Sequence, residues 1–84
     1  MKFIGDRPFS DPDAAARKLL DIVRGSIAKS NLPYAYTGAT NTDFTRADGS
    51  VGEYSVGMKY DVALKLFEVD SSGARIVLLA DGAE

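Results

Sequence analysis

The residues that could carry out acid–base chemistry in this chain are carboxylates and tyrosines, because the sequence contains neither histidine nor cysteine. Asp43, Asp48 and Asp70 fall in predicted loops, and Asp70 precedes Ser71 and Ser72. A serine nucleophile needs a base within reach, most often histidine. Two serines after an aspartate are more typical of a turn. We therefore predict that the chain is not an enzyme and uses no cofactor.

Two short segments are similar to known ligand loops, but neither matches at the positions that bind the ligand. Residues 43–50, DFTRADGS, lack the alternating acids and the final glutamate of a calcium loop. Residues 52–59, GEYSVGMK, space two glycines and a lysine almost as a phosphate loop does. Met58 interrupts that motif, and Tyr60 occupies the place of the magnesium-binding hydroxyl. We predict neither a metal site nor a phosphate loop.

The composition limits the classes of partner. Eighty-four residues predict one small domain over 1–84, and the 10 basic and 12 acidic residues leave a net charge of −2. Proteins that bind nucleic acid through its phosphates usually carry a basic face, so this balance disfavours that partner. The first residues lack the apolar run of a signal peptide, and no run is long enough to cross a membrane. We expect a cytoplasmic protein with no membrane partner.

The first predicted element is a helix over residues 12–30. Asp11 suits the N-cap and Pro12 the first helical position, while Asn31 and Pro33 end the helix near Ser30. Apolar residues recur at helical spacing and predict one buried stripe: Ala16, Leu19, Leu20, Val23 and Ile27.

The next segment predicts a strand followed by a turn. Tyr34 and Tyr36 alternate with Ala35, as in a short half-buried strand over 34–37. Residues 37–42 are rich in turn-forming types, and Phe44 is expected to return to the core. Asp48-Gly49 then indicates another turn.

Residues 50–66 allow two structures. Every second residue from Tyr54 to Leu66 is apolar, which is typical of a long strand. However, Ser50 and Glu53 have the spacing of a capping box, which predicts that a helix begins at Ser50. The interior Gly57 also disfavours a strand. Local patterns alone do not choose between these structures.

The last segment predicts a hairpin with strands at about 66–70 and 74–79. Gly73 can adopt the positive φ that a tight turn requires. Arg75 and Val77 should then face away from Ile76 and Leu78.

Several motifs resemble a family of small uncharacterised bacterial proteins with a winged-helix-like fold. The matching segments are Asp6-Arg7-Pro8-Phe9, Asp11-Pro12-Asp13, Ala15-Ala16-Arg17-Lys18-Leu19, Glu53-Tyr54, Gly57-Met58 and Ser72-Gly73. The chain departs from the family pattern at Asp61, where alanine is expected, at Lys65-Leu66, where Gly-Trp is expected, and at Ala74, where threonine is expected.

This resemblance implies a fold and no established activity. It favours a helix at about 51–64 followed by a wing hairpin. The expected fold is therefore α+β and winged-helix-like: helix 12–30, strand 34–37, helix 51–64, and strands 66–70 and 74–79.

The favoured function is a protein-interaction module whose partner is another protein or a second copy in a homodimer. Tyrosine is enriched at protein interfaces because its ring is apolar and its hydroxyl polar. The candidate surface residues are Tyr34, Tyr36, Tyr54 and Tyr60. The alternative for each is a core residue whose hydroxyl reaches the surface.

The other hypothesis is a DNA-binding winged-helix regulator that would use Lys59, Lys65 and Arg75. The charges on the helix are expected to cancel, because Glu53 and Asp61 lie on the same segment as the two lysines. In the predicted hairpin, Glu68 and Asp70 accompany Arg75, and their negative charge is unfavourable beside DNA phosphates. Another basic cluster, Arg17, Lys18, Arg24 and Lys29, is more typical of a solvated helix face.

Overall fold

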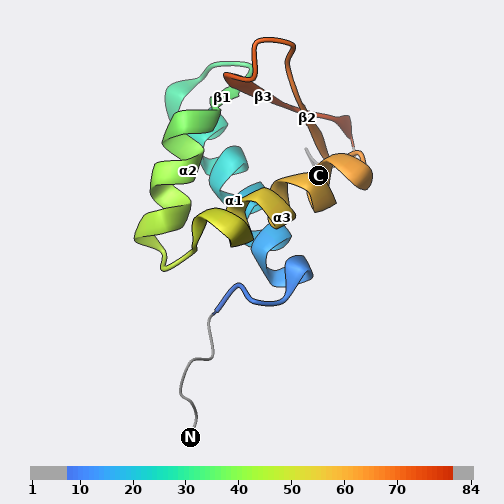
Figure 1. Ribbon diagram of the computed structural model, residues 1–84. Coiled ribbons are helices and arrows are strands. Elements are labelled where there is room, and N and C mark those ends of the chain that lie inside the picture. Colours follow the sequence, from blue (N-terminus) through green and yellow to red (C-terminus); the bar gives the residue numbers. More distant parts are fainter. Residues whose placement is uncertain (1–7, 81–84) are drawn as a thin grey trace, which may run out of the picture.

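The computed structural model describes residues 8–80 and contains three helices and a small sheet (Figure 1). The elements are α1 (Pro12–Ser30), β1 (Ala35–Tyr36), α2 (Thr37–Arg46), α3 (Val51–Ala63), β2 (Phe67–Val69) and β3 (Arg75–Leu78). The expected α+β class is confirmed. Predictions about the start of the chain, Asp6-Arg7 and the limits of the domain involve positions outside the described residues.

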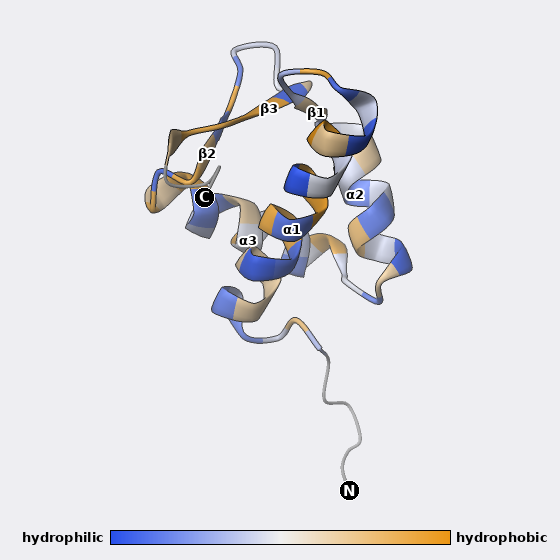
Figure 2. Ribbon diagram, turned by 180° about the vertical axis from the view of Figure 1, so that it is seen from behind, coloured by the Kyte–Doolittle hydropathy of each residue, from blue (hydrophilic) through white to orange (hydrophobic). Residues whose placement is uncertain are grey.

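The C-terminal hairpin forms as predicted. Its strands β2 and β3 are antiparallel, and β1 pairs with the other side of β3, so the strand order is β1-β3-β2. Gly73 has a φ of 77°, as the turn requires. Arg75 and Val77 face solvent while Ile76 is buried, which confirms the predicted alternation. The hydrophobic residues of β3 are coloured orange in Figure 2.

Helix α1 has the predicted ends. The Asp11 side chain accepts a hydrogen bond from the Asp13 N–H, Pro12 is the first helical residue, and Asn31 adopts the left-handed conformation with φ 60°. Of the predicted stripe, Ala16, Leu19 and Val23 are buried, while Leu20 and Ile27 are partly buried.

The turn predicted at 37–42 is wrong, because these residues begin α2. The threonine hydroxyls hydrogen-bond to backbone carbonyls four residues earlier: Thr40 donates to the carbonyl of Tyr36, and Thr42 donates to that of Gly38. Thr40 and Phe44 are buried against the rest of the domain. Tertiary packing therefore overrides the weak helical propensity of this segment.

Helix α3 is confirmed, and the long strand is wrong. The Ser50 hydroxyl accepts from the Glu53 N–H at 3.1 Å, and the Glu53 carboxylate accepts from the Ser50 N–H at 3.0 Å. This reciprocal capping box fixes the start of the helix. The turn between α2 and α3 contains Asp48, with φ 75°, and Gly49, which leaves no room for a Cβ beside the Phe44 ring.

The apolar alternation that is typical of a strand has another origin. It consists of two interleaved rows with i,i+4 spacing, which place each row on one side of a helix. Tyr54 and Met58 point toward the core. Val56, Tyr60 and Leu64 form the second row, whose side chains are 47%, 36% and 53% exposed. We call this second row the α3 outer row.

Helices α1 and α3 pack closely side by side in both views (Figures 1 and 2). Gly57 permits this approach, because a Cβ at that position would lie 2.7 Å from Leu19 Cδ1 and 3.1 Å from the backbone carbon of Ala15. The buried hydrophobic residues of the core are Ala15, Ala16, Leu19, Val23, Ala35, Phe44, Met58, Phe67 and Ile76.

Candidate functional site

Two of the four predicted tyrosines and one predicted arginine meet on the outer face of the sheet. The rings of Tyr34 and Tyr36 are 5.3 Å apart in an edge-to-face arrangement, and their hydroxyl oxygens are 3.3 Å apart. The Arg75 guanidinium lies 5.1 Å from the centre of the Tyr34 ring. The pairing of Tyr36 with Arg75 across β1 and β3 positions the group. We call these three residues the Tyr–Arg cluster.

Polar interactions hold this cluster in one arrangement. The side-chain hydrogen bond with Tyr34 raises the pKa of Tyr36, so the Tyr36 hydroxyl stays protonated at neutral pH. The Ser72 hydroxyl donates to the Asp70 carboxylate at 2.7 Å and lowers the pKa of Asp70. That carboxylate lies 3.9 Å from Arg75, at the limit of an ion pair. The cluster therefore presents phenol and guanidinium donors beside aromatic surface.

The other two predicted tyrosines lie elsewhere. Tyr54 is partly buried beside Phe44, and its hydroxyl donates to the carbonyl of Thr37 at 3.3 Å. Burial raises the pKa of Tyr54. Tyr60 belongs to the α3 outer row. The four tyrosines therefore do not form one surface, and Tyr54 mainly serves packing.

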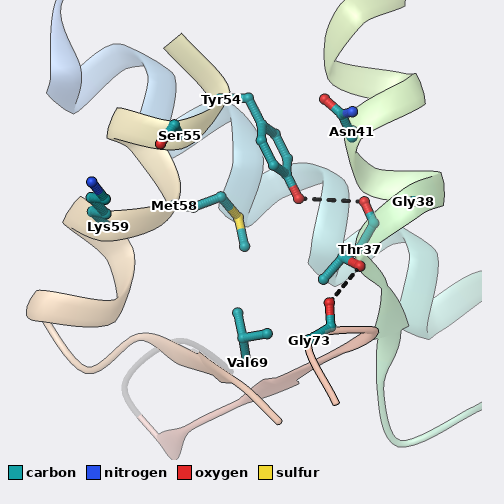
Figure 3. A pocket seen from close by; sticks show the side chains of 9 residues that line it. All are labelled: Thr37, Gly38, Asn41, Tyr54, Ser55, Met58, Lys59, Val69 and Gly73. Atoms are coloured by element: carbon teal, nitrogen blue, oxygen red, sulfur yellow. Dashed lines mark hydrogen bonds between the residues drawn. The ribbon is translucent and has the colours of Figure 1, made fainter. Parts of the chain in front are cut away.

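A groove lies between α2, α3 and the hairpin (Figure 3). It has a volume of about 480 Å³, with Met58 and Val69 as its apolar lining. Lys59 is at its edge, and the hydrogen bond from Tyr54 to Thr37 closes one side. Its polar side chains are those of Thr37, Asn41, Ser55 and Lys59. Within residues 8–80, no group of three or more acidic residues is placed to hold a metal ion.

Among the charged residues of α3, Asp61 differs most from the surface position expected from the sequence. The sequence places it with the surface charges of α3, but its side chain is only 1% exposed and its Oδ2 atom has no hydrogen-bond partner. Burial raises the pKa of Asp61 to about 7, although the positive charge of Arg24 acts in the opposite direction. Asp61 follows Gly57 by four residues, so it shares the side of α3 that faces α1. The spacing indicates this burial only once Gly57 is known to face α1.

The predicted DNA contacts are not brought into one cluster. Lys59 lies on α3, Lys65 follows the helix with φ 60°, and Arg75 belongs to the Tyr–Arg cluster. The cancellation of charge predicted for this segment is partly wrong, because Asp61 is buried. Neither lysine forms an ion pair within the described part of the chain. On α1, Arg17 pairs with Asp13 at 2.9 Å and is 80% exposed.

None of the helices within residues 8–80 is both long and apolar enough to span a membrane. Comparisons of the chain with protein-family models, with curated proteins and with solved structures found no match.

Proposed function

We propose that this chain is a non-enzymatic protein-interaction module and that the Tyr–Arg cluster binds its partner. The observation that supports this proposal is the meeting of Tyr34, Tyr36 and Arg75 at the surface, from segments almost forty residues apart in the sequence. Tyrosine and arginine are, with tryptophan, the residue types enriched among the side chains that dominate binding energy at protein interfaces.

The arrangement also limits the entropy lost on binding. The two rings and the guanidinium already contact one another, so fewer rotamers are lost when a partner covers them. The guanidinium has five N–H donors, and one carboxylate at 3.9 Å leaves most of them available. The partner that fits is a polypeptide surface presenting a carboxylate to Arg75 beside an apolar side chain that covers Tyr36.

Photo-crosslinking followed by affinity measurement tests this function. A photo-reactive residue at Val77, which shares the outer face with Arg75, should capture a protein from extracts of the source organism. We expect the Tyr36→Ala and Arg75→Ala variants to bind the purified partner about 30-fold more weakly, as is typical when a dominant contact is truncated. Ser71→Ala, an exposed change in the same hairpin, is the matched control and should bind like wild type. Equal affinity of all variants would contradict the proposal.

DNA binding is the second candidate, and two observations support it. Helices α2 and α3 are joined by four residues that include Gly49, the arrangement of a helix-turn-helix. The burial of Asp61 leaves Lys59 and Lys65 as the cations of this region. Against it stand the net charge of −2 and the apolar α3 outer row. The winged-helix-like fold expected from the sequence is therefore proposed only together with this second candidate.

Fluorescence anisotropy with a labelled 20-base-pair duplex decides between the two candidates. Phosphate contacts are strongest at low salt, so about 20 mM salt is the most sensitive condition. Since we favour protein interaction, we expect no change in anisotropy at protein concentrations up to about 100 μM, a range that covers ordinary non-specific binding. Binding that is lost in the Lys59→Ala and Lys65→Ala variants would instead favour DNA.

A further inference from the structure

Hydrogen bonds hold open the groove between α2, α3 and the hairpin (Figure 3). The Thr37 hydroxyl donates to the carbonyl of Gly73 at 2.9 Å, and the Thr37 carbonyl accepts from the Tyr54 hydroxyl at 3.3 Å. The Thr37 N–H donates to the carbonyl of Ala74 at 2.9 Å. The volume of about 480 Å³ falls in the range of small-molecule sites, roughly 300 to 1,000 Å³. The three walls therefore keep a space of ligand size between them.

The floor of this groove is apolar. Val69 points from β2 into the space below α3, and Met58 points down toward it from the helix (Figure 3). Met58 is mostly covered by the core, whereas Val69 is 36% exposed. A flat apolar group such as an aromatic ring would cover this valine and exclude water from it.

Two polar groups on opposite walls of the groove lack a partner within the described residues. The Oδ1 atom of Asn41 is buried and accepts no hydrogen bond, and the amide projects from α2 on the side of Tyr54 (Figure 3). The last torsion of asparagine is broad, so a small rotation turns this oxygen toward a donor in the groove. On the α3 wall, Lys59 is the one charged residue among the described lining residues, and it forms no ion pair there. The lining therefore offers an acceptor on one wall and a cation on the other.

We propose that the groove binds a small aromatic carboxylic acid that carries an N–H donor on its ring. The ring covers Val69 and Met58, the N–H donates to Asn41 Oδ1, and the carboxylate accepts from the Lys59 ammonium. Lys59 points away from the floor in Figure 3, and its flexible four-carbon stem lets the ammonium fold over the mouth of the groove. A buried acceptor without a partner is unfavourable, so a ligand donor that reaches Asn41 restores a missing hydrogen bond. This site lies apart from the Tyr–Arg cluster and goes beyond the proposed function.

Three related probes separate the contributions of the ring, the donor and the charge. Indoleacetate has all three groups, naphthaleneacetate lacks the N–H, and indoleacetamide lacks the charge. The groove is open to solvent, so we expect indoleacetate to bind with a dissociation constant of about 0.1 to 1 mM, as is usual for a ligand of this size. Each of the other two probes should bind about 5-fold more weakly, because each loses one polar contact.

Titration of the ¹⁵N-labelled chain with each probe, followed by two-dimensional amide NMR spectra, tests this inference. Saturable shifts should centre on the residues that line the groove: Gly38, Asn41, Ser55, Val69 and Gly73. Asn41→Leu should bind indoleacetate and naphthaleneacetate equally, and Lys59→Gln should bind indoleacetate and indoleacetamide equally. Lys65→Gln is the matched control, because Lys65 is also exposed but follows α3 outside the groove lining, and it should keep both preferences. The amide spectra establish that each variant is folded, and Asn41→Ala replaces Asn41→Leu if the latter is not.

The inference is overturned if indoleacetate causes no saturable shift in the groove, if the three probes bind equally, or if the Asn41 and Lys59 variants keep the wild-type preferences. The groove and the Tyr–Arg cluster can fail separately. Arg75→Ala should bind indoleacetate like wild type, whereas Lys59→Gln should keep its affinity for the partner captured at Val77.

Discussion

Replacing Asp61 by alanine should stabilise the domain by about 2 to 4 kcal/mol at pH 8, a large gain for a protein of this size. Burial raises the pKa of this carboxyl from 3.8 to about 7, and its Oδ2 atom has no hydrogen-bond partner. Holding a carboxylate there above pH 7 therefore opposes folding. Alanine removes this charge.

The gain should disappear in acid. Because the pKa is higher in the folded than in the unfolded chain, the folded state binds more protons between about pH 4 and pH 7. Wild-type stability from this group is thus fully present below pH 4 and is lost as pH rises through 7. Alanine has no such dependence, so the difference between the two proteins should shrink toward zero at pH 4.

Urea denaturation of wild type and Asp61→Ala at pH 4, 5, 6, 7 and 8 measures this difference. Other titrating groups, including Asp70, are present in both proteins and cancel in the comparison. Asp61→Asn is the companion variant, because it removes the titration and keeps a polar group at the site. A difference that is constant across this pH range would show that Asp61 is not buried as a titrating carboxyl.

The second large effect is expected at the contact between α1 and α3. Gly57→Ala should destabilise the domain by about 1 to 3 kcal/mol, since a Cβ at that position overlaps the buried Leu19 side chain and crowds Ala15. Leu19 is fully buried, so it cannot move into solvent. The better helical propensity of alanine offsets only a part of this loss.

Thermal denaturation of Gly57→Ala beside Gly25→Ala isolates the packing effect. Gly25 lies inside α1, and a Cβ there meets nothing within 4 Å. Gly25→Ala should therefore be stabilising by about 0.5 to 1 kcal/mol from backbone entropy alone. If both variants gained stability, the close approach of α1 and α3 at Gly57 would be wrong.

Features fixed by local chemistry could be predicted from the sequence. The N-cap at Asp11, the capping box of Ser50 with Glu53, and the turn at Gly73 each depend on neighbouring residues, and all three are confirmed. The pairing of the two hairpin strands, β2 and β3, could be predicted for the same reason.

Features fixed by distant contacts could not be predicted in this way. Helix α2 depends on burying Phe44 and Thr40, which no local pattern in a threonine-rich segment reveals. The Tyr–Arg cluster depends on the register of β1 with β3, so its residue types were identified but their meeting was not. Asp61 resembled a surface charge because the sequence alone did not establish which side of α3 faces α1.

The apolar alternation in residues 54–66 shows how one sequence pattern can have two structural interpretations. This alternation is typical of a strand, but the structure contains the helix α3, on which the same residues form two rows. An outward row of this length is not required by the core.

The most direct test of this account is a titration of the ¹⁵N-labelled chain with the partner captured at Val77, followed by two-dimensional amide NMR spectra. We predict that the signals of the Tyr–Arg cluster and of its neighbours in β1 and β3 shift or broaden as the partner is added. Signals of α1 and of the α3 outer row should stay constant. Spectra that do not change at Tyr36 and Arg75, or changes centred on α3, would contradict the account.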